Sequence, residues 1–158
     1  MPTSEALRAS PTCIDLIMES EGFRAKPYED CAGYLTVGYG HKVTSREFDK
    51  GIDRAQAYAL LAIDVAAAEA DVNRLVKVPL TQGQFDALVD FTFNMGVGRL
   101  AASTLLAKLN AGDYAAVPDQ LYRVDPDGTK HGWILAGGQV EPGLVQRRQD
   151  EIKLWRGI

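Results

Sequence analysis

The sequence contains few cysteines and histidines, which limits the chemistry open to it. Its 158 residues include two of each. Cys13 and Cys31 are too few for a disulfide framework and lack the C-x-x-C spacing, so we expect free thiols. His41 and His131 lie far apart and form no H-E-x-x-H motif, and the stretch DPDGTK is only a fragment of a calcium loop. We therefore expect no metal and no cofactor.

Long apolar runs and a basic surplus are also missing. No segment has the apolar length that crosses a bilayer, and the N-terminus lacks the cationic and apolar regions of a signal peptide. We therefore expect no membrane anchor and synthesis in a cytoplasm. The formal net charge is −4, and no basic stripe is present, which argues against nucleic acid as a partner.

Capping signals predict most of the helices. The pair Ser10-Pro11 begins the first helix, which should end near Gly22. Capping boxes at residues 53–56 and 81–84 begin a long alanine-rich helix and an apolar helix that ends at Gly96. Further helices are expected over residues 103–110, 114–122 and 142–155, with residues 125–143 mostly in loops.

Residues 35–40, LTVGYG, alternate as a short strand in a small hairpin or sheet would. The alternation predicts Leu35 and Val37 on one face and Thr36 on the other. One early β region followed by helices indicates an α+β fold.

Two carboxylates near this strand carry the functional hypothesis. Glu21 continues the apolar stripe that begins at Ile14, so it points toward the protein, and the helix end and burial both disfavour its negative charge. A general acid needs this arrangement, although an ordinary helix-end acid fits equally well. Asp30, in the turn YEDCAG, is either a simple turn former or a second, hydrated carboxylate. Two such carboxylates are what glycoside cleavage requires.

The residues that carry these signals form a recognisable pattern. Glu21-Gly22, Tyr28, Asp30, Gly33, Thr36 and the stretch GYGH resemble the signature of phage-type lysozymes, the endolysins of glycoside hydrolase family 24. The similarity continues through LTQGQFDALVDFTFNMGVG, STLLAKLNAGDY, the loop around Trp133 and PGLVQRRQDEIKLW, and so covers nearly the whole chain.

The resemblance implies a lysozyme-like α+β fold in a single catalytic domain over residues 1–158. A small β-containing lobe would occupy residues 22–55, and a helix over residues 54–76 would bridge to a helical lobe. The active-site cleft would lie between the two lobes.

The resemblance also implies the reaction. Glu21 would protonate the glycosidic oxygen between N-acetylmuramic acid and N-acetylglucosamine in peptidoglycan. Asp30 would stabilise positive charge at the anomeric carbon and, with Thr36, position a water, although Thr36 also suits a strand for its propensity alone. Phe93 and Asn94 would line the cleft, where an amide can bond to an N-acetyl group.

Neighbouring residues have weaker assignments. His41 is expected to be a structural histidine paired with an acid near the active site. Arg147 and Arg148 would meet the anionic peptide stems of peptidoglycan or form a solvated helix face. The family further implies a monomer that depends on a holin to leave the host cytoplasm and reach the periplasmic wall, and whose activity lyses the host cell.

Three alternatives remain open. A cysteine peptidase using Cys31 and His41 is disfavoured because Cys31 follows an aspartate that opposes thiolate formation. A lytic transglycosylase would cut the same bond but relies chiefly on one acid, so Asp30 and Thr36 favour hydrolysis. A catalytically idle wall-binding protein with a lysozyme fold is the third.

Overall fold

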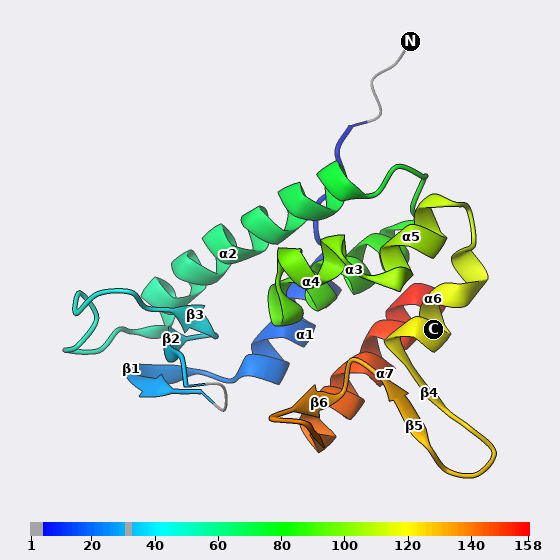
Figure 1. Ribbon diagram of the computed structural model, residues 1–158. Coiled ribbons are helices and arrows are strands. Elements are labelled where there is room, and N and C mark those ends of the chain that lie inside the picture. Colours follow the sequence, from blue (N-terminus) through cyan, green and yellow to red (C-terminus); the bar gives the residue numbers. More distant parts are fainter. Residues whose placement is uncertain (1–4, 31–32) are drawn as a thin grey trace.

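The computed structural model describes residues 5–30 and 33–158, with a small β-sheet beside a helical body (Figure 1). Helix α1 (Pro11–Glu21) leads into an antiparallel sheet of β1 (Arg24–Glu29), β2 (Leu35–Gly38) and β3 (His41–Lys42). The long helix α2 (Arg54–Leu75) then runs from the sheet to the helical body.

The helical body holds the rest of the chain. It contains α3 (Gln82–Met95), α4 (Val97–Ala101), α5 (Thr104–Asn110), the 3-10 turn η1 (Tyr114–Ala116), α6 (Val117–Leu121) and α7 (Pro142–Arg156). Two hairpins connect α6 to α7, namely β4 (Tyr122–Val124) with β5 (Lys130–Gly132) and β6 (Leu135–Ala136) with β7 (Gln139–Val140). The predicted α+β class is confirmed.

The predicted helix starts are also confirmed. The Ser10 hydroxyl accepts a hydrogen bond from the backbone of Cys13, and both capping boxes close reciprocally. Each box satisfies two backbone N–H groups that the first helical turn leaves unpaired. Gly22 and Gly96 end α1 and α3 with φ values of 68° and 93°, which residues with a side chain rarely adopt.

Helix α3 lies at the centre of the helical body, in contact with α1, α2, α4 and α7. Phe85, Leu88 and Phe91 on this helix are fully buried, and each stabilises the fold by about 1.5–3 kcal/mol. Because neighbours cover most of its sides, α3 also buries polar residues, including Asp86 and Asp90. These carboxylates need partners inside the protein.

The β structure adds detail to the sequence expectations. Residues 125–143, predicted to be mostly loop, also contain short strands, and Gly137 and Gly138, with φ values of 58° and 80°, form the tight turn between β6 and β7. In β2, Leu35 is 38% exposed while Thr36 and Val37 are 3% and 0% exposed, so burial does not separate the predicted faces. The central strand β2 is paired on both edges and contacts α2, so its covering does not follow simple alternation.

Cys13 is a free thiol that is fully buried in the core. Burial, helped by the negative charge of Asp86, raises the pKa of this thiol, which makes it unreactive. Cys31 lies outside the described residues, so its predicted free thiol stays a prediction. Among the helices of the described ranges, none is both long and apolar enough to cross a membrane.

Candidate active site

Glu21 is the last residue of α1, and its side chain is 20% exposed. Gly22 ends the helix at this point and donates its N–H to the carbonyl of Met18 at 2.9 Å. The side chain is therefore held against the protein while one part of it stays open to a ligand. The predicted inward orientation of Glu21 is confirmed.

The turn between β2 and β3 lies directly against this carboxyl group. A methyl group added at Gly40 would stand 2.6 Å from Oε2 of Glu21, which is closer than such atoms approach in proteins. Gly40 also has a φ of 77°. Glycine at this position therefore allows the sheet to contact the end of α1.

Arg147, on α7, holds the other oxygen of Glu21. Its Nη1 donates to Oε1 of Glu21 at 2.6 Å, while its Nε and Nη2 donate to the carboxylate of Asp90 at 3.1 and 3.0 Å. The side chains of Arg147 and Asp90 are 6% and 0% exposed. A buried guanidinium thus bridges α3 and the C-terminal end of α1, and each of its three nitrogens donates to a carboxylate.

The charges of this bridge are stabilised by one another. Burial acts to lower the pKa of Arg147, but the negative charges of Asp90 and Glu21 outweigh it and raise that pKa above its ordinary value. Burial likewise acts to raise the pKa of Asp90, but the charge of Arg147 and the hydrogen bonds from Glu151 and Arg147 together outweigh it, so that pKa is lowered. Arg147 and Asp90 therefore form a lasting ion pair behind Glu21.

A second buried arginine lies beside the first. The Nη2 of Arg148 donates to Oε1 of Glu151 and to Oδ1 of Asn94, both at 2.7 Å, and its Nη1 donates to the carbonyl of Trp133 at 3.3 Å. Arg148 and Glu151 have 0% exposed side chains. Asn94 and the Trp133 loop are thus attached to α7.

Glu151 is the acid of this second cluster whose pKa is raised. Burial raises its pKa well above the ordinary value, although the charge of Arg148 acts in the opposite direction. Its Oε2 accepts no hydrogen bond within the described part of the chain, and the neighbouring carboxylate of Asp90 is itself an acceptor. A proton on Oε2 satisfies both groups, because the protonated acid donates to Asp90.

Both expectations for Arg147 and Arg148 are therefore wrong. Neither side chain is solvated or available to an anionic ligand, because both are buried and already paired with acids. Sequence periodicity did not reveal the partners of Arg147, since Glu21 and Asp90 lie 126 and 57 residues from it.

Asp30 and Thr36 are linked through Tyr34. The backbone N–H of Tyr34 donates to Oδ1 of Asp30 at 2.9 Å, and its carbonyl accepts the hydroxyl of Thr36 at 3.0 Å. The strand register adds to this, because Tyr28 in β1 lies opposite Thr36 in β2. The two predicted residues thus lie near the end of the sheet where β1 and β2 are connected, while the turn at Gly40 that contacts Glu21 follows β2 at its other end.

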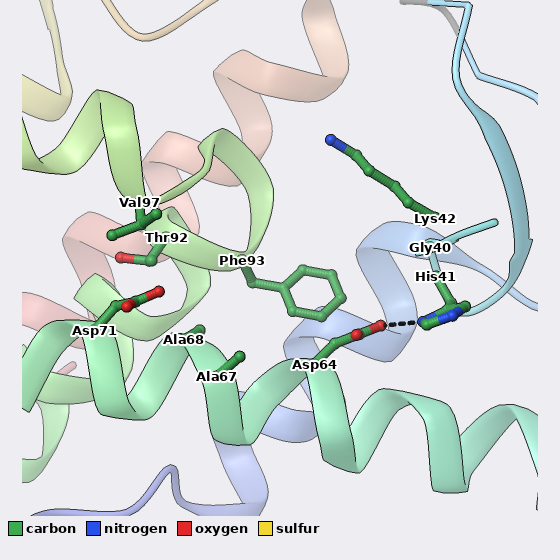
Figure 2. Close-up of a pocket in the computed structure, with 10 residues that line it drawn as sticks. All are labelled: Gly40, His41, Lys42, Asp64, Ala67, Ala68, Asp71, Thr92, Phe93 and Val97. Carbon is green, nitrogen blue, oxygen red and sulfur yellow. Dashed lines mark hydrogen bonds and ion pairs between the residues drawn. The ribbon is translucent and has the colours of Figure 1, made fainter. Parts of the chain in front are cut away.

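Two pockets are lined by Glu21 or by its neighbour Gly40. The Glu21 pocket, of about 570 Å³, is lined by residues that include Glu21, Asn94 and Arg147. The His41 pocket, of about 250 Å³, lies between β3, α2 and the C-terminal end of α3 and is lined by Gly40, His41 and Phe93 among others (Figure 2). Phe93 and Asn94, predicted to bind the same ligand, thus line different pockets.

His41 has the structural partner that was predicted. Its Nδ1 lies 2.8 Å from Oδ2 of Asp64 on α2, as the dashed line in Figure 2 shows. This contact attaches the sheet to α2 at the edge of the His41 pocket. No group of three or more histidine, cysteine or carboxylate residues among those described is arranged to hold a metal ion.

Solved structures with the same architecture are lysozyme-like. The muramidase domain of SpmX from Asticaccaulis excentricus superposes with a TM-score of 0.75 at 31% identity, covering 94% of this chain and 97% of that one. The fold is therefore lysozyme-like, with a glutamate at the end of the first helix, as predicted.

The chain belongs to the phage lysozyme family, whose pattern matches residues 18–151. It is 41% identical over 139 residues to the SAR-endolysin of Escherichia phage Mu, covering 88% of this chain and 75% of that protein. It is 38% identical over 151 residues to the endolysin of Bacillus phage B103, covering 94% of this chain and 54% of that protein. The predicted class, a lysozyme-type glycosidase, is confirmed.

Proposed function

We propose that the protein is an endolysin that hydrolyses the β-1,4 bond between N-acetylmuramic acid and N-acetylglucosamine in peptidoglycan and so lyses the host cell for phage release. The observation that carries the proposal is the placement of Glu21. One of its oxygens is fixed by a buried arginine, and the other faces the turn at Gly40; Glu21 lines one pocket and Gly40 the other.

This placement gives the two oxygens of Glu21 different roles. Oε1 accepts the hydrogen bond from Arg147, so Oε2 is the oxygen that carries the proton to the glycosidic bond. A glycan strand lying over the site would cover the exposed part of the side chain and exclude water from the proton transfer. Arg147 acts as a positioning residue, because its guanidinium donates to Glu21 and Asp90 and so holds the acid in place.

The remaining candidates have roles that the same geometry supports. The carboxylate of Asp30 stabilises positive charge at the anomeric carbon, and the Thr36 oxygen helps to place the attacking water. The Oδ1 of Asn94 accepts a hydrogen bond from Arg148. The Nδ2 of Asn94 is then left to donate to an N-acetyl carbonyl in the Glu21 pocket. Phe93 offers an apolar wall to the sugar on the other side.

The products of digestion distinguish this proposal from its alternatives. Purified Gram-negative peptidoglycan is digested, and the soluble muropeptides are analysed by mass spectrometry. Reducing muramic-acid ends support hydrolysis. Anhydro ends would make the protein a lytic transglycosylase, and binding to the wall without release of muropeptides would make it an idle wall-binding protein.

The same proposal covers the organisation of the chain. One catalytic domain over residues 1–158 would consist of the β-containing lobe near residues 22–55, the bridging helix near residues 54–76 and the helical lobe. Dependence on a holin, release from the host cytoplasm to the periplasmic wall and a monomeric state stay predictions.

A further inference from the structure

We propose that Lys42 binds a carboxylate of the peptide stem that is attached to muramic acid beside the bond that is cut. The inference rests on the proposed function, because it names a part of the substrate of the same site. It assigns to Lys42 the contact with anionic stems that the buried Arg147 and Arg148 do not make.

Lys42 pairs with one residue proposed to act on the sugar and is linked to two others through Gly40 and Tyr34. In the strand register it stands opposite Thr36. It follows Gly40, the turn residue that contacts Glu21, by two residues along the chain. Its Nζ lies 4.4 Å from the ring centroid of Tyr34, the residue whose N–H holds Asp30.

Lys42 is also the unpaired charge of the His41 pocket. Three other titratable side chains line this pocket, and each has a partner: His41 pairs with Asp64 at 2.8 Å, and Asp71 pairs with Arg74 at 3.2 Å. No ion pair joins Lys42 to any acid in residues 5–30 and 33–158. In Figure 2 the ammonium group extends away from the His41–Asp64 pair.

The contact with Tyr34 places this charge without neutralising it. A cation over an aromatic face is held by the electrostatics of the ring, and the remaining N–H groups stay free for an anion. Lys42 and Tyr34 are both exposed, so a ligand reaches them without a rearrangement.

Glycoside cleavage supplies a second reason for an anionic ligand at this place. Positive charge develops at the anomeric carbon in the transition state, and an unpaired ammonium near it would raise the barrier. A substrate carboxylate bound to Lys42 removes this repulsion. Peptide stems carry such carboxylates, whereas the two N-acetylated sugars are otherwise uncharged, so the stem is the source that fits.

The test combines a variant with a modified substrate. Wild type, Lys42→Met and Lys42→Arg are assayed on native peptidoglycan and on peptidoglycan whose carboxylates are converted to methylamides. Lys50→Met is the matched control, since Lys50 is also exposed but lines neither pocket. Thermal unfolding midpoints confirm that each variant is folded.

The expected result is a loss that depends on the carboxylates. On native peptidoglycan, Lys42→Met should lower kcat/KM about five- to tenfold, chiefly through KM, while Lys42→Arg and Lys50→Met stay near wild type. On the methylamide substrate, Lys42→Met should be at least as active as wild type, because the ammonium group of wild type then has no carboxylate to bind and only the repulsion remains.

Two other results would count against the account in different ways. If Lys42→Met equals wild type on native peptidoglycan, or loses the same factor on both substrates, the stem contact is overturned while the endolysin assignment stands. If wild type releases no muropeptides from either substrate, the proposed function fails and this inference fails with it.

Discussion

The carboxylate of Glu21 and the guanidinium of Arg147 are joined by a hydrogen bond of 2.6 Å, although the two residues are 126 positions apart. Arg147 is fixed in turn by Asp90, whose side chain is fully buried. The position of the proposed acid at the end of the first helix is therefore set by the last helix and the central one. Catalysis and the packing of the helical body are coupled through this arginine.

Replacing Arg147 with lysine tests this coupling. A lysine has a single ammonium group and cannot bond to Asp90 and Glu21 with the fork geometry of arginine. We expect kcat/KM for muropeptide release to fall about 100-fold, since small displacements of a catalytic group have effects of this size. Arg156→Lys, on the exposed end of the same helix, should keep wild-type activity. Wild-type activity in Arg147→Lys would show that the arginine does not position the acid.

Replacing Gly40 with alanine tests the contact between the sheet and Glu21. The new methyl group would meet Oε2 of Glu21 and push the carboxyl group out of place. The matched control is Gly128→Ala, because Gly128 also has a positive φ but no atom within 4 Å of the added methyl group. Both variants should lose about 1–2 kcal/mol of unfolding free energy from backbone strain.

Only Gly40→Ala should also lose activity, by at least about tenfold in kcat/KM. Circular dichroism melts and muropeptide release measure the two effects separately. Equal activity in the two glycine variants would contradict the proposed place of Oε2 in the cleft.

Replacing Glu151 with glutamine tests where the proton of the buried cluster resides. Because the folded state raises the pKa of Glu151, its contribution to stability is present below the unfolded pKa of about 4.3 and is lost as the pH rises through the folded pKa. Glutamine mimics the protonated acid and has no proton to lose. The unfolding free energy of Glu151→Gln relative to wild type should therefore improve with rising pH.

Urea denaturation at several values between about pH 4 and pH 7 measures this trend. Glu47→Gln, at an exposed position, is the control. A relative stability of Glu151→Gln that falls as the pH rises would place a negative charge on Glu151 and contradict the assignment.

Local signals in the sequence were sufficient for much of the fold. Helix starts at Ser10 and at the two capping boxes depend on neighbouring residues, so they are readable without tertiary structure. The hairpin at Gly137 and Gly138 was missed because its strands have two residues each, too few to show alternation. The two adjacent glycines were a turn signal that could have predicted it.

The site was predictable only in part. The inward orientation of Glu21 was predictable because this residue continues an apolar stripe. The structural role of His41 was predictable from its place after the glycine-rich strand. The burial of Arg147 and Arg148 was not predictable, because arginines are mostly exposed. The acids that pair with Arg147 come from α1 and α3, and no local pattern joins these helices to α7. Glu151 lies three residues after Arg148 on α7, a spacing that exposed helix faces also show.

The rate of muropeptide release by wild type and Glu21→Gln from the same purified peptidoglycan tests the central claim most directly. Glutamine keeps the shape of the side chain and an oxygen that can accept from Arg147. It has no acidic proton to transfer to the glycosidic oxygen. We expect the variant to remain folded and to lose about 100- to 10,000-fold in rate, the range that general acid catalysis supplies. A folded Glu21→Gln protein that releases muropeptides at the wild-type rate would contradict the account.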